Sequence, residues 1–99
     1  MYATVRRYTA KKGAAAGLRA ELKKSFLPVV RSIKGFEKYY YVSGGEENGR
    51  DVLLTVTVCQ TREGVEESVR KAAEWVKQHA RDADVASPVI TSGEVLETA

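Results

Sequence analysis

Between Thr61 and His79 the chain repeats apolar side chains every three or four positions. Such spacing is typical of an α-helix that buries one stripe of its surface, and Thr61 is a suitable N-cap. The stripe consists of Val65, Val69, Ala72, Ala73 and Val76. Ser68, Trp75 and His79 follow one another along its edge, so this helix presents a hydroxyl, an indole and an imidazole beside the core.

A second helical repeat runs from about residue 14 to residue 33. Its apolar positions are Leu18, Leu22, Phe26, Val29, Val30 and Ile33. Pro28 lies inside this repeat, lacks a backbone donor and crowds the preceding turn, so we expect a kink within residues 24–27. Gly35 is suited to the left-handed residue that follows many helix ends.

Four segments have the composition of β-strands. They are residues 2–8, 36–43, 51–60 and 89–97. Asn48 and Gly49 predict a tight turn between the second strand and the third. One face of the third strand is wholly apolar, and the other is semi-polar. The semi-polar residues are Leu53, Thr55, Thr57 and Cys59; this face predicts a wet cavity or a subunit contact.

The order strand, helix, strand occurs twice, which predicts an α+β, ferredoxin-like βαββαβ fold in a single domain over residues 1–99. Four antiparallel strands then pack one face against two helices. In the second strand, strict alternation places Phe36 with Tyr40 and Tyr39 with Tyr41, so both faces carry aromatic side chains and both need cover. A second copy is the simplest cover, which predicts a homodimer shaped as a dimeric α/β barrel.

Charge and composition narrow the class of partner. The net charge is +3, but Lys and Arg alternate with Glu along the chain, so nucleic acid is not expected. No apolar run approaches the roughly 20 residues of a membrane span, and the N-terminal stretch lacks the apolar core of a signal peptide; a cytoplasmic protein is expected. One Cys and one His provide neither an internal disulfide nor the ligand cluster of a metal site.

The chain resembles the antibiotic biosynthesis monooxygenase-like group of the dimeric α/β-barrel superfamily. Four stretches carry the resemblance: VRRY in the first strand, FLPVVRSIKGF at the end of the first helix, KYYYV in the second strand, and TREG…ESVRKAAEWV in the second helix. The resemblance implies a small pocket between sheet and helices. Some relatives there oxygenate aromatic polyketide phenols without metal or flavin, because the phenolate itself activates O₂, so no cofactor is expected.

An Asn, a Trp, a Tyr and an Arg are the usual pocket residues of such relatives. By position Trp75 corresponds to the Trp, whereas the only asparagine, Asn48, lies in the hairpin loop. The expected substrate-binding residues are Trp75, Tyr39, Ser68 and Phe26. Trp75 has a second interpretation, as a large apolar side chain that fills the helix–sheet contact.

Three residues are candidates for catalysis. Arg6 and Arg7 point to opposite faces of the first strand, and we favour Arg7 as the cation that holds a phenolate because it shares a face with Val5. Tyr41 is a candidate ring-binding hydroxyl. His79 is a candidate general base near neutral pH, and its alternative is a surface histidine favoured by the helix macrodipole.

The function expected first is a cofactor-independent, monooxygenase-like oxidoreductase acting on a small aromatic or polyketide-type substrate. The alternative is a non-catalytic dimer that binds a small ligand or only stabilises a partner. An isomerase or cyclase using the same pocket is a third interpretation. A cavity large enough for a bicyclic ring, lined by Trp75 and at least two polar groups, separates an enzyme from a structural dimer.

Overall fold

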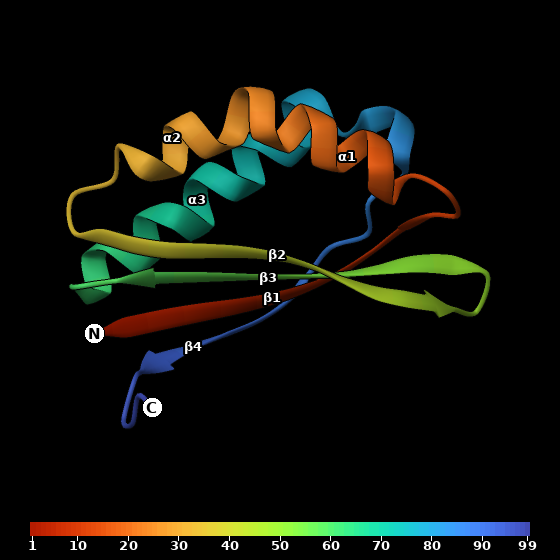
Figure 1. Cartoon of the computed structure of the whole chain (residues 1–99). Coiled ribbons are helices and arrows are strands. Elements are labelled where there is room, and N and C mark those ends of the chain that lie inside the picture. Colours follow the sequence, from red (N-terminus) through yellow and green to blue (C-terminus); the bar gives the residue numbers. More distant parts are fainter.

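The computed structural model describes residues 1–99 as one sheet covered on one face by helices (Figure 1). The strands are β1 (Tyr2–Lys11), β2 (Phe36–Glu47), β3 (Arg50–Cys59) and β4 (Val89–Glu94). The helical segments are α1 (Ala15–Glu21), the π-helical η1 (Leu22–Phe26), α2 (Leu27–Arg31), α3 (Arg62–His79) and the short 3₁₀ segment η2 (Arg81–Ala83). The predicted ferredoxin-like fold is confirmed.

The sheet is antiparallel throughout, in the order β2-β3-β1-β4. The predicted turn joins β2 to β3, and it has positive φ at both Asn48 (54°) and Gly49 (76°). Such a turn matches the twist of a two-residue hairpin. β2 extends beyond the strand that was predicted for residues 36–43, because β2 and β3 stay paired as far as Glu47 and Arg50.

The first helix changes its winding where a kink was predicted. Pro28 has no N–H to donate, and η1 precedes it as a π-helical turn between α1 and α2. Gly35, with φ of 80°, then ends the segment as predicted. The N-cap of α3 is also confirmed, since the Thr61 side chain accepts a hydrogen bond from the Gly64 amide at 3.1 Å.

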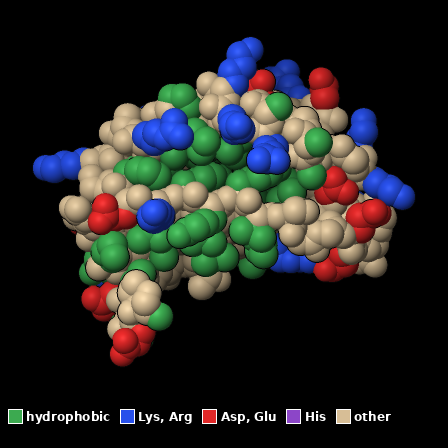
Figure 2. Space-filling model, in the orientation of Figure 1, with side chains coloured by type: hydrophobic (Ala, Val, Ile, Leu, Met, Phe, Trp, Pro, Cys, Tyr) green, Lys and Arg blue, Asp and Glu red, His purple; other side chains and the backbone are tan.

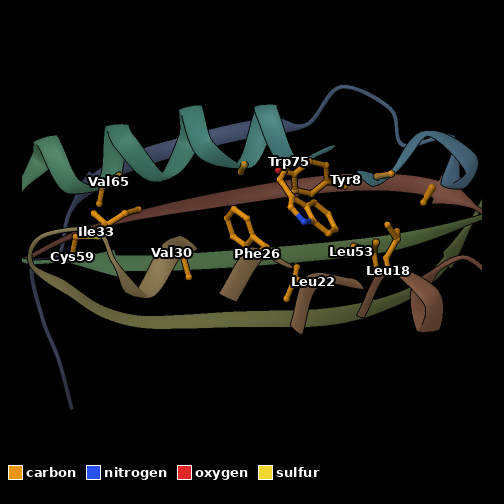
Figure 3. Close-up of a cluster of buried hydrophobic side chains, with 13 residues drawn as sticks. Tyr8, Leu18, Leu22, Phe26, Val30, Ile33, Leu53, Cys59, Val65 and Trp75 are labelled. Atoms are coloured by element: carbon orange, nitrogen blue, oxygen red, sulfur yellow. The ribbon is translucent and has the colours of Figure 1, made fainter. Parts of the chain in front are cut away.

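The core lies between the helices and the semi-polar face of β3 (Figure 3). Of that face, Leu53, Thr55, Thr57 and Cys59 are all buried. β2 has a bulge directly after Phe36, which breaks the strict alternation of side chains. Phe36 pairs with Cys59 and packs against the core, as Tyr39 does. The prediction that Phe36 and Tyr39 lie on opposite faces is therefore wrong.

The opposite face of the sheet carries no helix (Figure 1). Its most exposed apolar residues include Val5 (41%), Tyr40 (51%) and Val42 (41%), from β1 and β2. We call this surface the outer face. None of the helices is long and apolar enough to cross a membrane.

A carboxylate from β3 fixes the start of α1. Ala14 is the N-cap and has no side chain that caps; instead Asp51 accepts hydrogen bonds from the amides of Gly13 (3.1 Å) and Ala15 (3.0 Å). An anion is favourable at a helix N-terminus because the first N–H groups are unpaired there. Asp51 thus anchors the helix layer to the sheet.

We expect Asp51→Ala to lower the free energy of unfolding by about 1–2 kcal/mol, since two backbone N–H groups lose their acceptor. Urea unfolding followed by the fluorescence of Trp75 measures the change. Asp82→Ala is the matched control, because Asp82 is exposed and makes no side-chain hydrogen bond. Equal stabilities of the two variants would contradict the anchoring role.

Candidate functional site

A cavity of about 40 Å³ lies between the sheet and the helices. Its wall is mostly aromatic and aliphatic and comes from β1, β2, β3, the first helical segment and α3. The polar side chains that reach it are Arg6, Thr55 and the tyrosines Tyr8, Tyr39 and Tyr41. No carboxylate and no imidazole lines it. The cavity therefore offers a cation and hydroxyl groups in an apolar setting.

Trp75 forms one wall of the cavity and is at the same time buried in the core. Its ring lies 5.8 Å from Phe26, and Phe26 lies 5.6 Å from Tyr39, each pair tilted by nearly 60°. Figure 3 shows Phe26 and Trp75 side by side beneath α3. These three rings give the cavity an aromatic wall suited to a planar ligand.

The π-helical turn positions the indole. Nε1 of Trp75 donates a hydrogen bond of 2.7 Å to Oγ of Ser25, which lies within η1. The same hydroxyl donates to the Glu21 carbonyl at 2.9 Å. The indole N–H is thus already paired, and Trp75 presents its ring rather than its donor to the cavity.

Arg6 is the most unusual group in the site, because its charge is buried without a counter-ion. It exposes 1% of its surface and takes part in none of the four ion pairs of the chain. Its donors meet neutral acceptors: Thr55 Oγ1 at 3.0 Å, the Ser68 carbonyl at 3.2 Å and Thr57 Oγ1 at 3.4 Å. A buried cation without an anion is unfavourable by several kcal/mol, so the site favours an anionic ligand.

The preference for Arg7 is corrected by the direction of β1. Arg7 lies on the outer face, is 39% exposed and pairs with Glu47 in the hairpin. Arg6 is its neighbour in sequence but faces the helices, because successive side chains of a strand alternate. Arg6, not Arg7, is therefore the cation of the cavity.

Two further predicted residues lie outside the cavity wall. His79 stacks on Trp75 at 5.7 Å, and its Nδ1 lies 3.2 Å from Glu21 Oε1; both His79 and Glu21 line a separate open groove. The expectation that His79 acts as a base on a ligand in the cavity is corrected accordingly. Ser68 is fully buried and contributes its backbone carbonyl to Arg6, while its hydroxyl donates to the Val65 carbonyl.

The tyrosines of the cavity stay neutral well above physiological pH. Burial raises the pKa of Tyr39 from 10.0 to about 12, and the charge of Arg6 opposes that rise. Burial also raises the pKa of Tyr8 and of Tyr41. Tyr41 donates a hydrogen bond of 3.2 Å to the Ala15 carbonyl. The hydroxyls of Tyr8 and Tyr39 can donate hydrogen bonds to an anion, whereas that of Tyr41 is already paired, and none of the three is a base at neutral pH.

Sequence reasoning missed the role of Tyr8 and of Arg6 as the cation, whereas Thr55 lies on the semi-polar face that was expected to meet a cavity or a subunit. The signal was present: Thr4, Arg6 and Tyr8 share one face of the first strand, and Thr55 and Thr57 share one face of the third. Pairing those two polar faces would have identified them as one buried polar layer.

No protein-family model matches the sequence, and no curated protein matches it either. Solved structures do match. A protein of unknown function from Nitrosomonas europaea has a TM-score of 0.72 and 20% identity, over 99% of this chain and 91% of that one. SnoaB, a cofactor-independent oxygenase from Streptomyces nogalater, has a TM-score of 0.68 and 13% identity, over 98% and 94%. The chain shares their fold.

A dimeric ferredoxin-like protein from an uncultured marine organism also matches, with a TM-score of 0.69 and 9% identity, over 99% of this chain and 97% of that one. Identities in this range establish a common fold and not a common activity. The resemblance to antibiotic biosynthesis monooxygenase-like proteins is thus confirmed for the fold.

We expect the protein to lose stability as the pH rises from 10 to about 12. The folded-state pKa of Tyr39 lies above its ordinary value, so the contribution of the neutral phenol is complete below pH 10 and disappears as the pH passes about 12. Tyr39→Phe should flatten this fall, whereas Tyr2→Phe, at a position that does not line the cavity, should leave it unchanged. Urea unfolding at a series of pH values measures the slopes; identical slopes for all three proteins would contradict the assignment.

Proposed function

We propose that this protein is a cofactor-independent, monooxygenase-like oxidoreductase that binds a small phenolic or enolisable aromatic molecule in the cavity. The observation that carries the proposal is the buried guanidinium of Arg6, which has only neutral partners. A phenolate or enolate oxygen beside it would supply the missing counter-charge. The rings of Phe26, Trp75 and Tyr39 would then contact the end of the molecule that carries this oxygen.

In the proposed reaction the ligand binds as its anion. Arg6 favours the deprotonated form, and because no carboxylate or imidazole lines the cavity, the proton leaves to water. The bound anion reduces O₂: one oxygen atom enters the ring as a carbonyl, and the other leaves as water with the one hydrogen of the oxidised carbon and one proton taken back from solvent. The chain supplies orientation and an apolar setting, as in the oxygenation that the family resemblance implies.

A second candidate function is non-catalytic binding of the same class of ligand. The small volume of the cavity, about 40 Å³, and the lack of a base in its wall favour this candidate. Such a cavity admits only part of a bicyclic ring. The two candidates share Arg6 as the ligand-binding cation and differ in whether O₂ is consumed.

We also propose that the protein acts as a homodimer joined through the outer face. Val5 pairs with Val56, and Val56 pairs with Tyr40, so one apolar row crosses three strands of that face. Figure 2 shows apolar side chains gathered below β2, on the side away from the helices. Exposed apolar surface of this kind is typical of an interface, and one structure of the same fold is described as dimeric.

We expect Arg6→Met to lower the rate of oxygen uptake with an anthrone or naphthol substrate by about 100-fold, since a charge that stabilises the reacting anion is lost. Arg7→Met is the matched control and should retain the wild-type rate. Met preserves the apolar stem, and the urea-unfolding midpoint of each variant, measured alongside, shows whether it is folded. An oxygen electrode measures turnover, and quenching of Trp75 measures binding. Equal rates of oxygen uptake for Arg6→Met and Arg7→Met would overturn the role of Arg6. If a phenol quenches Trp75 of the wild type saturably but no oxygen is consumed, the non-catalytic candidate is the correct one.

We expect Val5→Lys to convert a dimer into a monomer of 10.9 kDa, because it introduces a charge into the centre of the apolar row. Sedimentation equilibrium over a range of concentrations measures the mass. Ala20→Lys, at an exposed position on α1, is the control and should remain dimeric. A monomeric wild type, or a Val5→Lys variant of unchanged mass, would contradict the proposed interface.

A further inference from the structure

An open groove of about 490 Å³ runs between the first helical segment and β2, next to the cavity. Four residues, Leu22, Tyr39, Tyr41 and Leu53, line both spaces. Figure 2 shows the corresponding hollow as an apolar strip between the helix layer and β2, with Lys and Arg side chains along its helical margin. The groove is therefore the outward continuation of the site that contains Arg6.

The two volumes determine where a ring-sized ligand must lie. Sites that bury a small molecule usually have about 300–1,000 Å³. At about 40 Å³ the cavity falls well below that range, whereas the groove, at about 490 Å³, lies within it. A ligand that reaches Arg6 with one end must therefore keep its other end in the groove.

The groove is positively charged. Arg19 and Lys23 line it, one helical turn apart, and neither takes part in any of the four ion pairs. No carboxylate is among its lining residues. Asp51, whose charge acts on Tyr41 of the groove wall, is buried and holds the amides at the start of α1. Two cations beside an apolar surface are complementary to an anionic group on an apolar ligand.

We propose that the groove binds the acidic end of the substrate, which makes the ligand an aromatic acid with a phenol or enol at one end and a carboxylate at the other. This inference rests on the proposed function, because Arg6 receives the phenolic oxygen. Arg19 and Lys23 receive the carboxylate, and Leu22 and Leu53 contact the ring between the two ends.

Two probes that share one ring system and differ in charge test the proposal: 6-hydroxy-2-naphthoic acid and its methyl ester. Their dissociation constants are measured by isothermal titration calorimetry at low and at high salt. We expect the acid to bind roughly 10-fold more tightly than the ester, because exposed ion pairs contribute modestly. High salt should reduce this preference, since the cations are open to solvent.

The variant Arg19→Gln/Lys23→Gln should abolish the preference for the acid and leave the affinity for the ester unchanged. Lys24→Gln is the matched control: Lys24 is an exposed cation of the same helical segment but does not line the groove. It should retain the full preference.

Three results would overturn the proposal. Equal affinities of wild-type protein for acid and ester would remove the preference itself. A preference that survives Arg19→Gln/Lys23→Gln and disappears in Arg6→Met would place the carboxylate on Arg6. In both of these cases, oxygen uptake that still depends on Arg6 would leave the proposed function standing. No heat of binding from either probe, together with no oxygen uptake from any phenol, would remove both proposals at once.

Discussion

The guanidinium of Arg6 joins three parts of the structure that are distant in sequence. It extends from β1 and donates to two threonines of β3 and to a backbone carbonyl of α3. Each nitrogen of the guanidinium has an acceptor there, so these contacts hold β1, β3 and α3 together around the buried cation. The same contacts leave the charge itself uncompensated. Fold and site therefore depend on one side chain.

Pro28 changes the winding of the first helical segment at the part that lies opposite Arg6. A regular helix through residues 22–26 would need an amide that Pro28 lacks, and the π-helical turn accommodates this change. The turn holds Ser25 where the indole of Trp75 can donate to it. A backbone irregularity thus fixes the aromatic wall opposite Arg6.

Local signals predicted the fold well because each acts within a few residues. Thr61 caps a helix, Gly35 ends one, and Asn48 with Gly49 reverses the chain, whatever the rest of the molecule does. The bulge after Phe36 could not be predicted in this way. It depends on how β2 meets β3, and one extra residue changes which side chains share a face.

The site was predicted less well because sequence does not show which face of a strand meets the helices. The more apolar face of β3 looks like the core face, yet the structure uses it on the outside and places Thr55 and Thr57 inside. Arg6 and Arg7 lie on opposite faces of β1, so the preference for Arg7 followed from the same choice of core face. A sheet covered on both sides needs apolar residues on both faces, so hydrophobicity alone does not distinguish them.

His79 illustrates a second limit of sequence patterns. It follows Trp75 by one helical turn, and the structure does place the two rings in contact. Only the indole lines the cavity, because His79 stacks on that ring and its Nδ1 lies 3.2 Å from Glu21 Oε1 instead. Helical spacing predicts which residues are neighbours, whereas the size of each side chain decides which of them reaches the ligand. With no imidazole at the cavity, the charge of Arg6 is what remains to favour an anionic ligand, and binding must then select molecules that release a proton readily in water.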